Sequence, residues 1–392
     1  MITVALVGLG KMGLSHLAMI RPHPDVEVVG VCDATGYVLD ILGRTTGVPT
    51  FSDYERMLDE AKPLAVIIST PSSLHAPMVR QALERDIHVF CEKPLFLNPE
   101  DGVALTALAA ERGLVTQVGY HNKFVGTFQE VKRLLDIGAI GEVATIQAEA
   151  FGPVVLKPSG ASWRSKRASG GGCLYDYAAH PLDLVTWYFG KPDAVGGSRL
   201  TSIFSAEIDD AVTSTLYYPG GRTAQLTTNW SDESQRKMTT RISLWGTGGH
   251  IYADRQEVQV FLRGTSAIPA GYRQGWTVKY TTELTENPWF YLRGEEYSHQ
   301  LDTFVTRVAA RQLDGPNTFA SASVTDEVIA MIVADAERGP RTDAEVSQAA
   351  GVSLGMGRVA GHGRVGLVPR AVGMLRSAAS RVAARRARRA RR

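Results

Sequence analysis

The feature that most constrains the fold is a glycine hexapeptide that directly follows the first apolar run. Residues 2–7 are almost entirely apolar, as expected for a strand buried on both faces, and Gly8, Gly10 and Gly13 then form the pattern G-x-G-x-x-G. The first glycine permits a tight turn, the second lets the backbone approach a pyrophosphate, and the third lets a helix pack closely on the strand. Because a helix N-terminus favours phosphate charge, the motif predicts a dinucleotide site.

An acid stands where the ribose of a dinucleotide would be recognised. The second predicted strand, residues 26–31, leads to Asp33, twenty residues past the last glycine of the motif. A carboxylate at this position can accept hydrogen bonds from ribose hydroxyls. No arginine occurs in residues 33–36, so we expect NAD rather than NADP. Lys11 and Met12, inside the glycine motif, are also expected to contact the cofactor. The alternative is that Asp33 is a turn or helix-capping residue.

Strands and helices then alternate for about 120 residues. Apolar runs at 64–68, 87–90 and 114–118 predict strands, and helices are expected to begin at a capping box at 52–55 and at Asn98. Beyond them, longer alternating strands follow one another, at 143–150, 211–218, 223–230, 239–244 and 257–262, and helices are predicted at 297–310 and 324–337. We therefore predict an α/β protein with an N-terminal doubly wound parallel sheet and a C-terminal, mostly antiparallel open sheet.

These patterns divide the chain into three predicted parts. Residues 1–122 form the dinucleotide-binding domain, residues 123–340 form an α/β substrate and oligomerisation domain, and residues 341–392 form a linker and an Arg-rich tail. The tail holds twelve arginines and two acids, a net charge of +10, which leaves −8 for the rest of the chain. A basic amphipathic helix in the tail would bind an anionic membrane or nucleic acid; the alternative is a disordered, solvated end.

A lysine stands just past the fourth strong strand signal. Lys93 follows Phe90, Cys91 and Glu92 and precedes Pro94. Ligands of open α/β sheets bind outside the carboxyl ends of the strands, so this cation is expected to face a pocket. The Lys93–Pro94 bond is also a candidate for the cis form, because proline is the residue that permits it.

An acid and a histidine in the second half are one helical turn apart. Asp176 and His180 follow three glycines and have i, i+4 spacing, which on a helix places both on one face. A carboxylate can hold an imidazole in one tautomer and raise its basicity, as a general base requires. The alternative is a structural pair on a helix surface. Pro181 predicts an irregular turn at this point.

The glycine motif, Glu92-Lys93-Pro94 and Asp176-x-x-x-His180, in this order, resemble the glucose–fructose oxidoreductase/inositol dehydrogenase (Gfo/Idh/MocA) family, over about residues 1–340. The resemblance implies a Rossmann domain joined to an α/β domain, and oxidation or reduction of a sugar, nucleotide-sugar or cyclitol carbon with NAD(P). It implies that Lys93 polarises the reacting hydroxyl, that His180 accepts its proton, and that Asp176 is a partner of His180 or a substrate ligand. It further implies a homodimer or homotetramer.

The resemblance also suggests further site residues. Asp183 would support the helix, and the strand ends would complete the cofactor site with Thr70, Pro71, His75, Glu92 and Lys93. Members often have Tyr-Asn-Arg-Arg where this chain has Tyr120, His121, Asn122 and Lys123. We expect Tyr120, Asn122 and Lys123 to contact substrate.

A basic cluster precedes the Asp176 helix. Lys157, Arg164, Lys166 and Arg167 lie in an otherwise acidic body, so Arg164 and Arg167 would bind the phosphate or carboxylate of an anionic sugar. The alternative is a solvated loop.

Composition restricts the class of protein. Three scattered cysteines argue against disulfides and zinc and favour a reducing, cytoplasmic setting, and no metal site is expected. Two other functions fit the same residues: a glycosidase or epimerase that oxidises its substrate transiently, and a non-catalytic dinucleotide-binding regulator.

Overall fold

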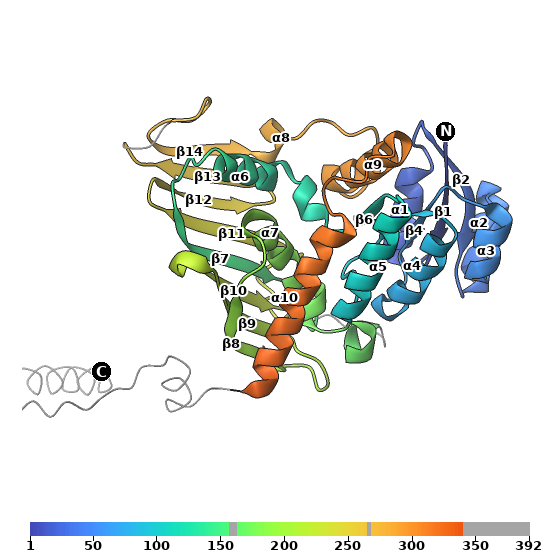
Figure 1. Ribbon diagram of the computed structural model, residues 1–392, viewed down its shortest axis with the longest axis horizontal. Helices are drawn as coiled ribbons and strands as arrows, with labels where there is room; N and C mark the ends of the chain where they lie inside the picture. Colours follow the sequence, from blue (N-terminus) through green and yellow to red (C-terminus); the bar gives the residue numbers. More distant parts are fainter. Residues whose placement is uncertain (157–162, 265–267, 340–392) are drawn as a thin grey trace, which may run out of the picture. The chain divides into compact units, whose positions relative to one another are not determined.

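The computed structural model describes residues 1–156, 163–264 and 268–339 of the chain. These residues build two sheets (Figure 1). The predicted tail and Lys157 of the basic cluster lie outside the described residues.

The N-terminal sheet has six parallel strands in the order β3-β2-β1-β4-β5-β6. The order reverses between β1 and β4, which makes the sheet doubly wound, as predicted. Its elements are β1 (Ile2–Val7), α1 (Lys11–Ile20), β2 (Val26–Cys32), α2 (Gly36–Thr46), β3 (Thr50–Phe51), α3 (Tyr54–Ala61), β4 (Ala65–Ile68), α4 (His75–Glu84), β5 (His88–Cys91), α5 (Pro99–Glu111) and β6 (Thr116–Val118).

The second sheet has eight strands in the order β14-β13-β12-β11-β7-β10-β9-β8. Only β7 and β10 pair in parallel, which confirms a mostly antiparallel sheet. This part contains α6 (Gly126–Asp136), β7 (Val143–Phe151), α7 (Ala179–Phe189), β8 (Ala194–Thr201), β9 (Ala211–Tyr217), β10 (Thr223–Asn229), β11 (Thr239–Gly246), β12 (Gly249–Asp254), β13 (Glu257–Leu262), β14 (Gly275–Tyr280), α8 (Thr281–Leu284), α9 (Glu295–Ala310) and α10 (Phe319–Arg338).

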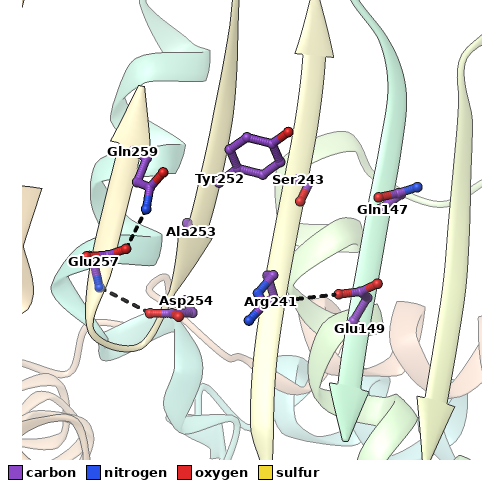
Figure 2. Close-up of a pocket in the computed structure, with 9 residues that line it drawn as sticks. All are labelled: Gln147, Glu149, Arg241, Ser243, Tyr252, Ala253, Asp254, Glu257 and Gln259. Atoms are coloured by element: carbon purple, nitrogen blue, oxygen red, sulfur yellow. Dashed lines mark hydrogen bonds and ion pairs between the residues drawn. The ribbon is translucent and has the colours of Figure 1, made fainter. Parts of the chain in front are cut away.

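The two faces of the second sheet differ in what covers them. Alternate residues such as Ile146, Leu244 and Val260 are fully buried in the core that also contains residues of α6 and α7. On the other face, polar side chains of β7, β11, β12 and β13 line a hollow of about 380 Å³ (Figure 2). The strand alternation therefore leaves one face of this sheet without a helix in the described part of the chain.

Helix α9 packs on the N-terminal sheet although it follows the second sheet in sequence. Leu301, Phe304 and Val308 are buried in the cluster that contains Leu6 and Phe90. The ring of Phe304 lies 5.8 Å from that of Phe90, edge to face. The predicted boundary at residue 122 therefore separates the two sheets but not all of the helices that cover them.

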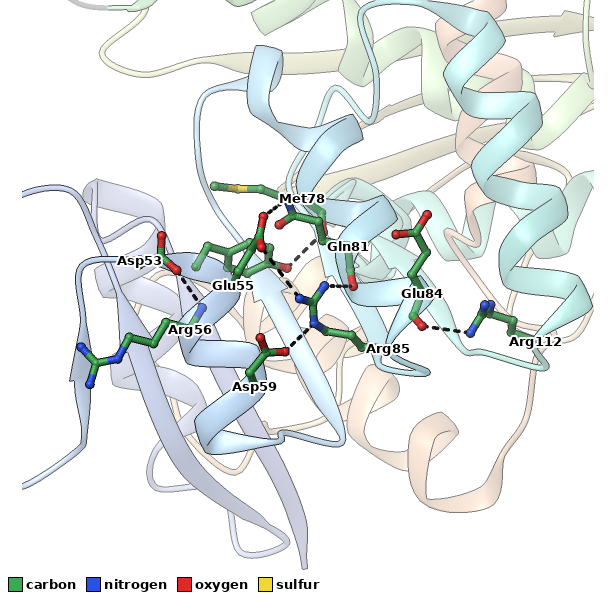
Figure 3. A network of polar contacts seen from close by, with 10 residues as sticks. Asp53, Glu55, Arg56, Asp59, Met78, Gln81, Glu84, Arg85 and Arg112 are labelled. Atoms are coloured by element: carbon green, nitrogen blue, oxygen red, sulfur yellow. Dashed lines mark hydrogen bonds and ion pairs between the residues drawn. The ribbon is translucent and has the colours of Figure 1, made fainter.

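Local sequence signals set several helix ends. Asn98 caps α5 by accepting a hydrogen bond from the Glu100 amide at 3.1 Å. For α3 the predicted capping box is one residue out of place, because Asp53 is the N-cap and accepts from the Arg56 amide at 2.7 Å. Figure 3 shows that Arg85, the residue that follows α4, donates to Asp59 of α3 at 2.8 Å and so joins α3 to the end of α4.

None of the helices in the described ranges is long and apolar enough to cross a membrane.

Candidate active site

The glycine loop leaves open space at the end of β1. Gly8 has φ +85°, in the region that favours glycine, and a Cβ on it would lie 2.7 Å from the backbone of Ser69. A Cβ on Gly13 would lie 1.7 Å from the Gly8 carbonyl oxygen, whereas one on Gly10 would meet no atom within 4 Å. Gly10 caps α1 without a side-chain hydrogen bond. The close packing at Gly8 and Gly13, together with the space beside Gly10 at the start of α1, thus fits a pyrophosphate.

Asp33 lies beside this loop, at the end of β2. One of its carboxylate oxygens accepts from the Leu9 amide at 2.5 Å and the other from the Thr35 amide at 2.8 Å. Asp33 therefore organises the loop as a turn residue, while it remains partly exposed next to the glycines. Lys11 is exposed and Met12 is partly exposed at the start of α1.

The loop after β4 is joined to the loop after β5 by a buried histidine. His75 has one ring nitrogen 3.0 Å from the Pro94 carbonyl oxygen and the other 3.0 Å from that of Thr70. Pro71 precedes the turn that leads into α4. Burial lowers the pKa of His75. Its predicted contact with the cofactor remains a prediction; in this structure both ring nitrogens face the backbone.

Glu92 pairs with a histidine of α1 that the sequence did not single out for this role. His16 Nε2 lies 2.7 Å from Glu92 Oε1, and the other carboxylate oxygen accepts from the Lys93 amide at 3.2 Å. Burial raises the pKa of Glu92, but the hydrogen bond and charge of His16 and the charge of Lys93 outweigh it and hold that pKa below its ordinary value. The pair joins the helix of the glycine loop to the segment that carries Lys93.

Lys93 lies just past β5, and its amine is held by Asp176. Nζ donates to the Asp176 carbonyl oxygen at 2.9 Å and to Oδ1 at 2.8 Å, and the Lys93–Pro94 bond is cis, as expected. Arg164 Nε donates to the second carboxylate oxygen at 3.0 Å. Burial raises the pKa of Asp176, but the charges of Lys93 and Arg164 outweigh it, so the group stays ionised. Two residues 83 positions apart thereby meet at the strand end.

The predicted contact between Asp176 and His180 does not form. Residues Leu174–Ala178 are a π-helical turn, so the one-face geometry of i, i+4 spacing does not apply where α7 begins. Two cations take both oxygens of the Asp176 carboxylate, and His180 Nδ1 is buried without a hydrogen-bond partner among the described residues. A carboxylate gains more from two cations than from a neutral imidazole, which explains the difference.

His180 is poised as a neutral base. Burial lowers its pKa well below the ordinary value, and the nearby positive charges of Lys93 and Arg255 lower it further. Its ring meets those of Tyr120 and His121, at centroid distances of 6.3 Å and 4.9 Å. A neutral imidazole can accept a proton at ordinary pH.

The loop after β6 is more deeply buried than a substrate-binding loop would need to be. Lys123 Nζ lies 2.8 Å from Asp183 Oδ1, and both side chains are at most 2% exposed. Asn122 donates to the Thr240 hydroxyl at 3.4 Å, and Tyr120 is fully buried. Asp183 thus supports this loop, and a substrate contact by Lys123 would require the ion pair to separate.

Two arginines of the basic cluster lie close to buried aspartates. Arg164 holds Asp176, and Arg167 lies 3.8 Å from Asp209, while both arginines are about half exposed. The structure therefore places Arg164 on the carboxylate that also binds Lys93, although no motif predicted the Arg164–Asp176 contact. Within the described ranges, no group of three or more His, Cys, Asp or Glu residues could hold a metal ion.

Comparison with known proteins agrees with this architecture. The sequence profile described as "Oxidoreductase family, NAD-binding Rossmann fold" matches residues 2–120, and that of the GFO/IDH/MocA C-terminal domain matches residues 128–252. The dTDP-3,4-didehydro-2,6-dideoxy-α-D-glucose 3-reductase of Streptomyces violaceoruber is 30% identical over 279 residues, 69% of this chain and 77% of that protein. The 2,7-anhydro-N-acetylneuraminate hydratase of Escherichia coli is 29% identical over 273 residues, 67% of this chain and 70% of that protein.

The fold is also that of a solved dehydrogenase. A levoglucosan dehydrogenase in complex with NADH and L-sorbose superposes with a TM-score of 0.76 at 22% identity, over 86% of this chain and 97% of that one. The two profiles together match more than half of the 392 residues, so the chain belongs to the Gfo/Idh/MocA family of NAD-binding oxidoreductases.

Proposed function

We propose that this protein transfers a hydride between a CH–OH carbon of a sugar, nucleotide sugar or cyclitol and a nicotinamide. The observation that carries the proposal is the Lys93–Asp176 pair, with Nζ and Oδ1 2.8 Å apart, at the end of β5. Lys93 acts electrostatically on His180, whose pKa it helps to lower. A cation and a neutral base are what removal of a hydride from a hydroxyl-bearing carbon requires.

The residues have distinct roles in the proposed reaction. Lys93 orients the substrate hydroxyl and stabilises the negative charge that develops on its oxygen. His180 accepts the hydroxyl proton at a ring nitrogen. Asp176 holds the Lys93 amine in place through two acceptors, its carbonyl oxygen and Oδ1. The bound dinucleotide supplies the hydride acceptor.

The proposed cofactor is NAD rather than NADP, held by Gly8, Gly10 and Gly13 with Asp33 at the ribose. Asp33 places a carboxylate next to the loop, and no arginine occurs in residues 33–36, which favours a free ribose hydroxyl over a phosphate. Titration with NADH and NADPH by nucleotide fluorescence measures the preference. Tighter binding of NADPH would contradict it.

The central experiment combines a substrate panel with two variants. Neutral sugars, uronates, nucleotide sugars and cyclitols are incubated with NAD, and NADH release is followed by absorbance. Lys93→Ala and His180→Ala are expected to lose turnover by about a hundredfold or more at unchanged NADH affinity. Lys191→Ala, a lysine paired with Glu327 on the surface, is the matched control. Wild-type turnover in either active-site variant would refute the proposal. Conversion of the sugar without net NADH release would indicate transient oxidation.

Assembly and location complete the proposal. The face of the second sheet that carries the hollow, and no helix of the described residues, offers a surface for a homodimer or homotetramer, which light scattering would detect. Cys32, Cys91 and Cys173 are free and buried, which favours a reducing, cytoplasmic compartment. A role for the basic tail stays a prediction.

A further inference from the structure

His180 lacks the hydrogen-bond partner that a buried general base needs. Its Nδ1 is buried and finds no partner in the described part of the chain, because Lys93 and Arg164 occupy the Asp176 carboxylate. When an imidazole accepts a proton, both ring nitrogens become donors. A buried N–H of a charged ring without an acceptor is costly, so some group must receive it.

The ring next to His180 belongs to another histidine with the complementary deficiency. His121 lies in the 3₁₀ turn His121–Phe124, and its ring centroid is 4.9 Å from that of His180 at an interplanar angle of 62°. Its Nε2 is also buried and has no partner within residues 1–156, 163–264 and 268–339. Tyr297 of α9 stacks on the His121 ring, at 4.6 Å and 19°. His121 thus contacts both His180 and α9.

We propose that His121 receives the second N–H of His180 when His180 takes the substrate proton, so that the two imidazoles share one positive charge. The proposal rests on the proposed function. The substrate O–H bond breaks and its proton binds one ring nitrogen of His180, while the electron pair of the C–H bond leaves as hydride to the dinucleotide. The other N–H of His180 then donates to Nε2 of His121. At 4.9 Å between centroids, rotation of either ring or one bridging water can make this contact.

The positive charges around His180 and His121 allow one of the two imidazoles to be protonated and disfavour protonation of both. The charge of Lys93 acts on His180 from the segment that follows β5, and Arg255, in the turn between β12 and β13, acts on both rings. Arg293, which stacks on Tyr297 at 5.2 Å, also acts on His121. Burial and then the His180 charge lower the pKa of His121 well below its ordinary value. His121 is therefore neutral and available as an acceptor when His180 becomes charged.

The remaining acids near the pair are already committed. Asp176 bridges Lys93 and Arg164, and Glu296 pairs with Arg255. Tyr297 and Tyr120 are neutral, because burial raises the pKa of both phenols. The Tyr120 hydroxyl is also buried without a partner among the described residues, but the Tyr120 ring centroid lies 6.3 Å from that of His180, against 4.9 Å for His121. His121 is therefore the nearer ring with an unused buried acceptor.

The test replaces the nitrogen of His121 while keeping its shape. His121→Phe retains the stack on Tyr297 but cannot accept a hydrogen bond, whereas His121→Gln keeps an acceptor. In the phenylalanine variant we expect kcat to fall about tenfold, the loss of roughly one hydrogen bond to a charged group, with KM little changed. The acid limb of the kcat/KM profile should move to lower pH, because the charged form of His180 is less stable. The glutamine variant should restore both kcat and the position of the acid limb.

His250→Phe, in a separate aromatic cluster on β12, is the control.

The outcomes separate this proposal from the proposed function. The proposed function itself would be refuted if the wild-type protein showed no turnover, or if turnover survived the His180→Ala substitution. With turnover present, an unshifted acid limb in His121→Phe, or equal defects in the phenylalanine and glutamine variants, overturns the proton-sharing role. Nuclear magnetic resonance of ¹⁵N-histidine in the full-length wild-type protein with NADH gives an independent reading. His121 and His180 titrating as a coupled pair supports the proposal, and independent titration overturns it.

Discussion

Replacing Asp176 with asparagine tests the electrostatic centre of the site with almost no change in shape. Asp176 is the acceptor for two cations, at 2.8 Å from Lys93 Nζ and 3.0 Å from Arg164 Nε. The side chains of Lys93 and Asp176 are 13% and 7% exposed, so solvent screens this ion pair only weakly. Arg164 is 46% exposed and adjusts to water at lower cost.

The expected loss follows from the bonds that the amide cannot replace. A hydrogen bond to a charged group is worth about 1.5–3 kcal/mol. Because the amide oxygen can still accept from Lys93, we expect the lower part of that range, about 1.5–2 kcal/mol. If the position of Lys93 limits the stabilisation of the alkoxide, kcat/KM falls roughly 10- to 30-fold. The affinity for NADH should not change.

Thermal unfolding gives a second measurement with a defined pH dependence. Burial raises the pKa of Asp176, but Lys93 and Arg164 hold it below its ordinary value. The carboxylate therefore stabilises the fold above the unfolded-state pKa of about 3.9, and this contribution is lost as pH falls through the lower folded-state value. The wild type should melt higher than Asp176→Asn near neutral pH, and the difference should shrink in strong acid.

The matched control is Asp59→Asn. Asp59 lies on α3, and its exposed carboxylate accepts from Arg85 at 2.8 Å (Figure 3). Exposed ion pairs of this kind contribute little, so activity should stay at the wild-type level. If Asp176→Asn also matched the wild type in both kcat/KM and melting temperature, the role of Asp176 in holding Lys93 would be wrong.

Four other changes test the glycine loop, the core, the protonation of His180 and the basic cluster. Gly13→Ala places a Cβ 1.7 Å from a backbone oxygen of the loop, so NADH affinity should fall by about tenfold or more in a fluorescence titration. Phe304→Ala should lower the free energy of unfolding by about 3–5 kcal/mol in urea, since the ring is 1% exposed in the core of the N-terminal sheet. Oxidation should keep its plateau in kcat/KM as pH falls through about 6.5, because the pKa of His180 is well below that value and the base stays neutral. Arg167→Ala should raise KM for an anionic sugar and not for a neutral one, whereas Arg164→Ala should lower kcat for both, because it also holds Asp176.

Signals contained in a short segment were read correctly. The apolar run with its glycines predicted β1, the turn and α1, and Asn98 predicted the start of α5. Strands β3, β8, β12 and β14 were not predicted from the sequence. Strand β8 contains two glycines, and β14 is exposed or half-exposed at every position. The alternation of Trp276, Val278 and Tyr280 in β14 and the alternate buried positions of β12 were nevertheless present in the sequence and were overlooked.

Contacts between distant segments needed the tertiary structure. The spacing of Asp176 and His180 indicated a pair. In the structure a π-helical turn changes the helix geometry, and the Asp176 carboxylate binds Lys93 and Arg164 instead. The pairing of His16 with Glu92 spans 76 positions and has no motif.

The sequence alone therefore determined the dinucleotide loop, the alternation of strands and helices, and the presence of Lys93 at a strand end, because these depend on neighbours a few residues apart. The tertiary structure decided which group each of those side chains meets. It placed α9 on the N-terminal sheet, Asp176 on Lys93, and His121 against His180. The physical reason is that charge pairing and burial depend on which distant segments the fold brings into contact. A periodic sequence pattern reports only on neighbours a few residues away.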